Sequence, residues 1–307
     1  MFKQIIFNTL LDKFPITIDI IYIQALKGRY IVPMGIAHHF KRHAMKNIEL
    51  HQILNSEKII TAFINNHIRF HTIQLFRKSG SKENKQKGTG ILIDFFGVYC
   101  LFTSRHIVED TFESNQLYFK LGPDEYLLCT GTTEESERKS NLTISYIILD
   151  LSIAESLIVI GYKFLPNEKI LPNHDTLETP QYTAVGFSKP TSGQEQENTQ
   201  SNGSYIISQM APDTYYDNHI YPKEDNFIMS YAQPKEIMTG IKDKSKVLFD
   251  MSGSGLWYIS ITKNNEIIEY DYHLISIITE LYIHKRHQFL IATKINLITD
   301  HLKELIS

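Results

Sequence analysis

From His67 onward the sequence is a succession of short β-rich runs separated by polar turns, and this pattern restricts the fold more than any other feature. The runs are rich in β-branched and aromatic residues and include HIRFHTIQLF, GILIDFFGVYCLFTS, NQLYFKL and LTISYIILDLSIA. After Pro180 a second series begins with QYTAVGFS and continues through SYIISQM, VLFDMSGSGLWYISI, EIIEYDYHLISIITELYI and FLIATKI. We therefore expect a mostly β fold built in two successive halves.

Helical spacing flanks the β-rich region on both sides. Apolar residues recur every fourth position in residues 36–55, and they line one side of residues 296–307. This spacing predicts a partly helical N-terminal extension, residues 1–60, and a C-terminal helix. Two polar stretches, residues 79–88 and 189–204, contain glycine and lack apolar periodicity, so we expect flexible loops there.

The composition is that of a soluble globular protein with one large β domain or two ordinary ones. Its 307 residues are 42% hydrophobic, which supplies a sizeable core. The net charge of −3 gives no basic field for nucleic acid. Charged and polar residues interrupt the apolar runs of residues 1–26, so we expect neither a secretory signal nor a membrane span. Two cysteines suit a reducing compartment, and we expect a cytoplasmic protein.

The histidines and cysteines do not predict a metal site or cofactor. His67 and His71 have the spacing of two ligands on one helix face, whereas HIRFHTIQLF is typical of a strand. The basic, histidine-rich residues 38–46 favour a solvated helix face over a surface for nucleic acid or acidic lipid. Cys100 and Cys129 lack CxxC spacing, and we expect both thiols to be buried in the first β-rich half.

Three motifs place reactive side chains at the ends of predicted strands. In YCLFTSRHIVED a strand ends shortly before His106, and Asp150 closes the apolar run LTISYIIL. In FDMSGSGLW, Ser252 stands in a glycine-rich turn, where small residues let the backbone bend and a substrate carbonyl approach. Backbone amides in such a bend can stabilise an oxyanion. The three side chains together indicate nucleophilic catalysis.

These motifs resemble those of the chymotrypsin-like (trypsin-fold) serine proteases, especially the bacterial, disulfide-poor members. TSRH around His106 is similar to the family's histidine motif, DLS at Asp150 to its acid motif, and SGSGL at Ser252 to its nucleophile motif. The order is the family's own, and the gaps of 44 and 102 residues are near its roughly 45 and 93. GTGILI, AVGFS and LISIIT are similar to further strands of the family, so the resemblance covers about residues 60–307.

The resemblance implies two antiparallel six-stranded β-barrels with the active site between them. The trypsin-like domain would span residues 61–307, with barrel one at about 61–175, barrel two at about 180–295 and the helix at 296–307. It also implies a bacterial serine endopeptidase that acts on protein or peptide substrates without a cofactor. By analogy, a regulatory partner protein would control it.

In that family's mechanism, Ser252 would attack the peptide carbonyl, His106 would transfer the proton, and Asp150 would orient the imidazole. The backbone amides of Asp250 and Ser252 would form the oxyanion hole. The substrate pocket would be lined by Lys246, Thr279, Glu280 and Leu281.

Several positions depart from the family pattern. Asp250 replaces a glycine, and its carboxylate is unfavourable near a developing oxyanion. Met251 replaces the aspartate that pairs with a freed N-terminus in secreted members, which excludes that route of activation. Lys246 is not acidic, which argues against a trypsin-like preference for Lys or Arg, and a bulky Leu281 would narrow the pocket. We expect a small or apolar side chain before the cut.

Alternatives remain at each level. Ser254 competes with Ser252, and the acids that compete with Asp150 are Asp110, Asp124 and Asp175. Only Ser252 is followed by Gly-x-Gly-Leu, and the competing acids lack either the distance from His106 or the strand context. The main alternative function is a catalytically inactive trypsin-fold binding module. Another is an adaptor in which residues 1–60 bind a partner. Neither nucleic acid nor a membrane is expected as a partner.

Overall fold

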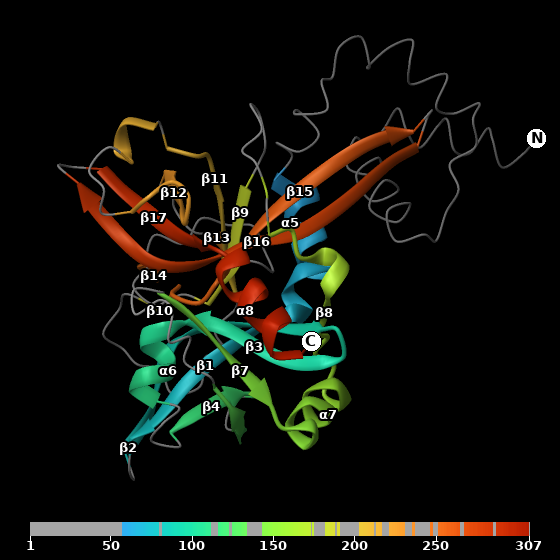
Figure 1. Cartoon of the computed structure of the whole chain (residues 1–307), viewed down its shortest axis with the longest axis vertical. Helices are drawn as coiled ribbons and strands as arrows, with labels where there is room; N and C mark the ends of the chain where they lie inside the picture. The colour runs from blue at the N-terminus through green and yellow to red at the C-terminus, as the bar shows by residue number, and fades with distance from the viewer. Residues whose placement is uncertain are drawn as a thin grey trace, which may run out of the picture. The chain divides into compact units, whose positions relative to one another are not determined.

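The computed structural model describes residues 57–306 with gaps, and most of the regular structure there is β (Figure 1). The gaps are residues 80–81, 112–115, 123–124, 134–142, 173, 175–181, 188, 191–202, 212, 217–220, 231–234, 237–245, 248–250, 265–266 and 285–286. The helix expected in residues 36–55 lies outside the described residues. The chain divides into two compact units, Met1–Ala62 with Lys263–Ile268, and Phe63–Thr262 with Glu269–Ser307.

The first sheet is antiparallel except for one short strand. Its strands are β1 (Thr72–Ser79), β2 (Lys82–Phe95), β3 (Val98–Ser104), β4 (Leu117–Lys120), β5 (Tyr126–Leu128), β6 (Gly131–Thr132), β7 (Ile144–Leu149) and β8 (Leu165–Pro166). The order is β5-β4-β1-β2-β3-β7-β6, and β8 pairs in parallel with β2. Alternate side chains such as Leu75, Leu92 and Leu101 are buried in one core, as period-two strands require.

The second sheet is formed by the later β-rich runs. Its strands are β9 (Tyr182–Gly186), β11 (Ser204–Ser208), β12 (Asn226–Ser230), β13 (Lys235–Glu236), β15 (Gly255–Asn264), β16 (Ile267–His284) and β17 (His287–Lys294). The order is β12-β17-β16-β15-β9-β11-β13. A separate pair consists of β10 (Lys189–Pro190) and β14 (Lys246–Val247). Tyr182, Met251 and Leu256 are buried in the core of this sheet.

The mostly β prediction is confirmed, but closed six-stranded barrels are not what the described strands form. The two sheets have eight and seven strands, and the end strands β5, β6, β12 and β13 each pair with one in-sheet neighbour. The end strands β6 and β13 have two residues each, so they offer few backbone groups with which a sheet could close. Within the described residues, both sheets are therefore open.

Short helices connect and flank the strands. They are α5 (Glu57–Asn66), η1 (Ile68–His71), α6 (Arg105–Thr111), α7 (Leu151–Val159), η2 (Asn167–Lys169), η3 (Asp213–Tyr215) and α8 (Asn296–Ile306). The predicted C-terminal helix is confirmed as α8. Within the described part of the chain, no helix has the length and apolar character to cross a membrane.

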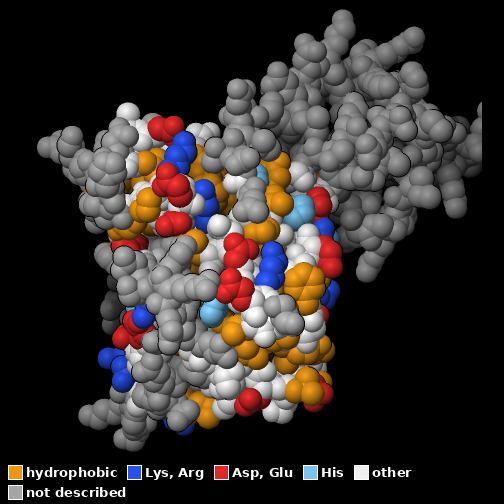
Figure 2. Space-filling view, viewed as in Figure 1, with side chains coloured by type: hydrophobic (Ala, Val, Ile, Leu, Met, Phe, Trp, Pro, Cys, Tyr) orange, Lys and Arg blue, Asp and Glu red, His pale blue; other side chains and the backbone are white. Residues whose placement is uncertain are grey.

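The described surface mixes charged and apolar side chains. Side chains of both charge signs are interspersed over the face shown in Figure 2. Hydrophobic side chains gather over α7 at the lower right of that view, where the exposed fractions are 62% for Leu151, 46% for Ile158 and 84% for Val159.

Two predicted strands are partly helical. In HIRFHTIQLF, residues 68–71 form η1 and β1 begins only at Thr72, because the His67 amide continues the preceding helix by donating to the Phe63 carbonyl (3.0 Å). In LTISYIILDLSIA, β7 ends at Leu149 and α7 follows, because the Asp150 carbonyl accepts the amide of Ala154 (3.1 Å).

The predicted loop over residues 79–88 is also wrong in part. Ser79 ends β1, and residues 82–88 belong to β2, which pairs with β1 from Ser79↔Lys82 to Thr72↔Ile91. Backbone pairing therefore orders a polar segment that lacks an apolar pattern of its own. The other predicted loop, residues 189–204, begins with β10 and ends at β11, and its middle lies outside the described residues.

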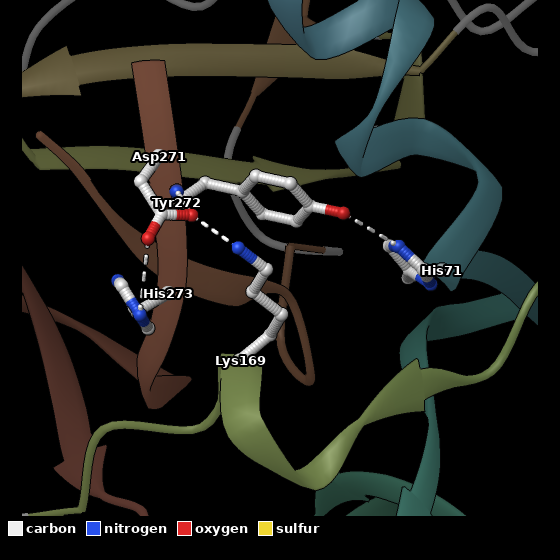
Figure 3. A network of polar contacts seen from close by, with 5 residues as sticks. All are labelled: His71, Lys169, Asp271, Tyr272 and His273. Atoms are coloured by element: carbon white, nitrogen blue, oxygen red, sulfur yellow. Dashed lines mark hydrogen bonds and ion pairs between the residues drawn. The ribbon is translucent and has the colours of Figure 1, made fainter. Parts of the chain in front are cut away.

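A buried histidine ties β16 to the first half of the domain (Figure 3). The Nδ1 of His71 donates to the carbonyl oxygen of Lys163 (2.8 Å), so in the neutral ring its Nε2 accepts from the hydroxyl of Tyr272 (3.2 Å). Burial lowers the pKa of His71 to about 4, which keeps the ring neutral. Beside it, Asp271 forms an ion pair with Lys169, and its Oδ2 lies 3.6 Å from Nε2 of His273.

The described residues contain no group of three or more His, Cys, Asp or Glu side chains arranged to hold a metal ion. Cys100 and Cys129 are free and buried in the first half, as expected from the sequence.

Candidate active site

Ser252 stands in a tight turn that is pressed against the first sheet. Gly253 has a φ of +84°, and a Cβ there would overlap the carbonyl oxygen of Thr89 and the hydroxyl of Thr103. Only glycine fits both the left-handed backbone and the close approach. The Met251 side chain before the turn is fully buried in the second core, which explains an apolar residue at this position.

The same contacts bring Ser252 next to α6, the helix that carries His106. The Thr89 amide donates to the Ser252 carbonyl (2.9 Å). A Cβ on Gly88 would meet both the Ser252 carbonyl oxygen and the side chain of Ile107, so these two groups lie close together beside Gly88. The structure thus brings the predicted nucleophile and the predicted base into one region. The Ser252 hydroxyl itself donates to the carbonyl of Thr279 (3.3 Å).

The imidazole of His106 is held on its Nδ1 side by a hydroxyl. Ser104 Oγ lies 2.8 Å from Nδ1 and donates weakly to the Thr143 carbonyl (3.4 Å). When the Ser104 hydroxyl proton points to the Thr143 carbonyl, Ser104 Oγ accepts a hydrogen bond from Nδ1–H of His106. The Nε2 atom of His106 then keeps the lone pair that a general base needs. Partial desolvation lowers the pKa of His106, while Asp110 and Glu280 raise it and Lys87 lowers it further.

Asp150 is not brought to His106, which corrects the predicted triad. In the antiparallel pairing of β3 with β7, Ser104 faces Ile144 and Cys100 faces Ile148. Asp150 therefore lies at the far end of β7, roughly 20 Å along the strand from Ser104. Asp150 directly precedes α7, and its carboxylate accepts a hydrogen bond from the hydroxyl of Thr130.

Thr143, which the sequence motifs did not single out, lies directly before β7. Its carbonyl accepts from the Arg105 amide (2.9 Å), so residue 143 is adjacent to the chain that leads into His106. Its hydroxyl lies 2.5 Å from that of Thr293, which is 3.4 Å from the hydroxyl of Thr279. The missed signal was the antiparallel pairing of β3 with β7. This pairing places the start of β7, and not its end, next to the residues that lead into His106.

The competing acids do not supply a triad partner among the described residues. Asp110 pairs with Lys87 at 3.7 Å and contributes a charge near His106. Asp124 and Asp175 lie outside the described residues, as does the predicted oxyanion residue Asp250. Ser254 is fully buried, with its hydroxyl against Gly186, which leaves Ser252 as the better-placed nucleophile.

The predicted pocket residues have different surroundings. Thr279 is buried and offers its carbonyl to Ser252, whereas Glu280 is exposed and accepts a hydrogen bond from the Tyr221 hydroxyl (2.6 Å). Leu281 is partly buried against the second core. Lys246 pairs with Pro190 in the short β10–β14 ladder.

No protein-family model matches this chain, and no curated protein does. Among solved structures, a chain titled "Atomic resolution structure of HBP" is similar, with 10% sequence identity and a TM-score of 0.45. The alignment covers 77% of this chain and 91% of that one. At this level, the likeness carries no argument about fold or function.

Proposed function

We propose that the protein is a serine endopeptidase of the trypsin type, in which Ser252 and His106 form a catalytic pair. The observation that carries this proposal is the close approach of the Ser252 turn and of the α6 residue Ile107 beside Gly88, one residue along the chain from His106. Two successive antiparallel sheets support the trypsin-like plan, in which each half of the domain contributes one member of the pair. The free, buried Cys100 and Cys129 support a reducing compartment such as the cytoplasm.

The proposed reaction uses side chains and backbone of this chain alone. Ser252 Oγ attacks a peptide carbonyl, and His106 Nε2 takes the hydroxyl proton and returns it to the leaving amine. Water then hydrolyses the acyl-enzyme by the same route. In this reaction the Ser252 amide would donate to the oxyanion. We expect slow turnover, because replacing the orienting carboxylate in such a site costs about 10⁴ in rate.

Cleavage of a diverse peptide mixture, read by mass spectrometry, tests this function. The wild-type chain should produce new peptide ends, and both Ser252→Ala and His106→Ala should abolish them. Ser254→Ala serves as the matched control because this buried hydroxyl is not part of the proposed pair. Cleavage that persists in Ser252→Ala would contradict the proposal.

The alternative is a catalytically inactive trypsin-fold module that binds peptides. The observation in its favour is that a hydroxyl, from Ser104, contacts Nδ1 of His106, whereas no carboxylate of a described residue forms a hydrogen bond with that ring. Such a module would retain peptide binding without producing new ends. It would bind equally well as wild type and as Ser252→Ala.

A further inference from the structure

Glu280 lies beside the proposed nucleophile and faces solvent. It follows Thr279 on β16, and the Thr279 carbonyl accepts the Ser252 hydroxyl (3.3 Å). Thr279 is 2% exposed, whereas Glu280 is exposed. The carboxylate is therefore presented to solvent one residue away from the backbone group that contacts Ser252.

The Glu280 carboxylate is held by a hydrogen bond, and no described cation pairs with it. Tyr221 donates its hydroxyl to Oε2 of Glu280 (2.6 Å), which restricts the side chain and leaves Oε1 open to another donor. The two acids of α6 that act on His106 have cationic partners: Asp110 pairs with Lys87 (3.7 Å) and Glu109 with Arg105 (2.5 Å). Among the described residues, no lysine or arginine forms an ion pair with Glu280.

We propose that Glu280 is a specificity-determining residue that selects peptides with a Lys or Arg side chain close to the bond that is cut. An ammonium or guanidinium group would donate to the open carboxylate oxygen and supply the missing positive charge. This inference rests on the proposed peptidase function. It replaces the expectation of a small or apolar preference, which was drawn from the bulk of Leu281 and from the lack of an acid at Lys246. Leu281 packs partly into the core, and Glu280 supplies a carboxylate from β16 instead.

Peptidyl phosphonate esters test this preference because they react with the serine and carry chosen side chains. A matched set would place lysine, norleucine or glutamate at each of the three positions before the reactive group. For the wild-type chain we expect one position at which lysine reacts roughly two- to fivefold faster than norleucine, as an exposed ion pair would give. The ratio of the two rates should approach one in Glu280→Gln. It should be retained in Glu109→Gln, which removes another exposed acid near His106.

Two results would overturn the assignment. One is a lysine-to-norleucine ratio near one in the wild-type chain at every position. The other is a Glu280→Gln variant that slows both probes equally, since that pattern would mean that Glu280 acts on His106 and not on the peptide.

A binding experiment tests the role of Glu280 even if the chain is not a peptidase. If the phosphonates and an uncharged fluorophosphonate all fail to label the wild-type chain, calorimetry with the corresponding lysine and norleucine peptide amides replaces the reaction. Tighter binding of the lysine peptide to wild type than to Glu280→Gln would support the assignment of Glu280 without catalysis. Equal binding would overturn it.

Discussion

At the scale of single residues, the site combines a well-supported serine with a histidine whose orientation depends on hydroxyl groups. Glycine is the only residue type that fits at position 253, where the Ser252 turn meets Thr89. The Ser104 hydroxyl orients the His106 ring by a hydrogen bond with Nδ1. The motifs of Ser252 and His106 could be recognised in the sequence because turn chemistry is local. The role of Asp150 could not, since it depends on the register between β3 and β7.

Replacing Thr143 by aspartate should increase the reactivity of Ser252. Residue 143 adjoins Ser104 and Arg105, so a carboxylate there would lie on the Nδ1 side of His106 and stabilise the imidazolium that forms during attack. We expect Thr143→Asp to accelerate labelling by a fluorophosphonate by at least about tenfold, a fraction of the full effect of a triad acid. Thr143→Asn is the control, because asparagine has the shape of aspartate without its charge. Equal rates for both variants and wild type, with folded protein, would contradict this account of the site.

The pH dependence of labelling should report His106. Because desolvation lowers the pKa of His106, its neutral form should persist below pH 6.5, and the labelling rate should rise with pH through a midpoint under that value. Lys87→Gln should move the midpoint upward, because it removes a positive charge and leaves Asp110 unpaired. Lys85→Gln, on the same strand, is the control. A midpoint that Lys87→Gln leaves in place would argue against His106 as the base.

At the scale of secondary-structure elements, antiparallel register decides what the sequence pattern leaves open. Pairing with β1 draws the polar residues 82–88 into β2, and helical hydrogen bonds to Asp150 turn DLSIA into α7. By contrast, α8 and the buried strands could be predicted because their apolar spacing is strong and local.

The helix α7 offers a direct test of which apolar side chains hold an element in place. Leu157 is fully buried in the first core, whereas Val159, two residues later, is 84% exposed. Leu157→Ala should lower the free energy of unfolding by about 2–5 kcal/mol, through lost transfer energy and the cavity left behind. Val159→Ala should change it by less than about 0.5 kcal/mol. Urea denaturation measures both, and equal effects would contradict the assigned orientation of α7.

At the scale of the whole molecule, the two halves of the domain are joined through buried polar contacts that no local pattern predicts. His71 contacts Lys163 and Tyr272, which are 92 and 201 residues away in sequence. The Thr143 and Thr293 hydroxyls make a second such contact, over 150 residues. These pairs depend on the tertiary fold, so the sequence could indicate two β-rich halves but not the residues that join them.

Acid should destabilise the protein through His71. Its pKa is about 4 in the folded chain and 6.5 in the reference state, so the unfolded chain binds more protons between these values. Stability from this group is therefore complete above pH 6.5 and is lost as the pH falls toward 4, by about 3 kcal/mol in total. His71→Gln should reduce the acid-side loss seen in urea denaturation at pH 7.5 and pH 5. An identical loss in wild type and variant would show that His71 is not the group responsible.

The central claim is that Ser252 and His106 form a working nucleophilic pair, and intact-mass analysis after treatment with a broad fluorophosphonate tests it most directly. The account predicts one adduct on the wild-type chain and on Ser254→Ala, and none on Ser252→Ala or His106→Ala. An unlabelled wild-type chain, or a chain labelled equally after Ser252→Ala, would contradict it.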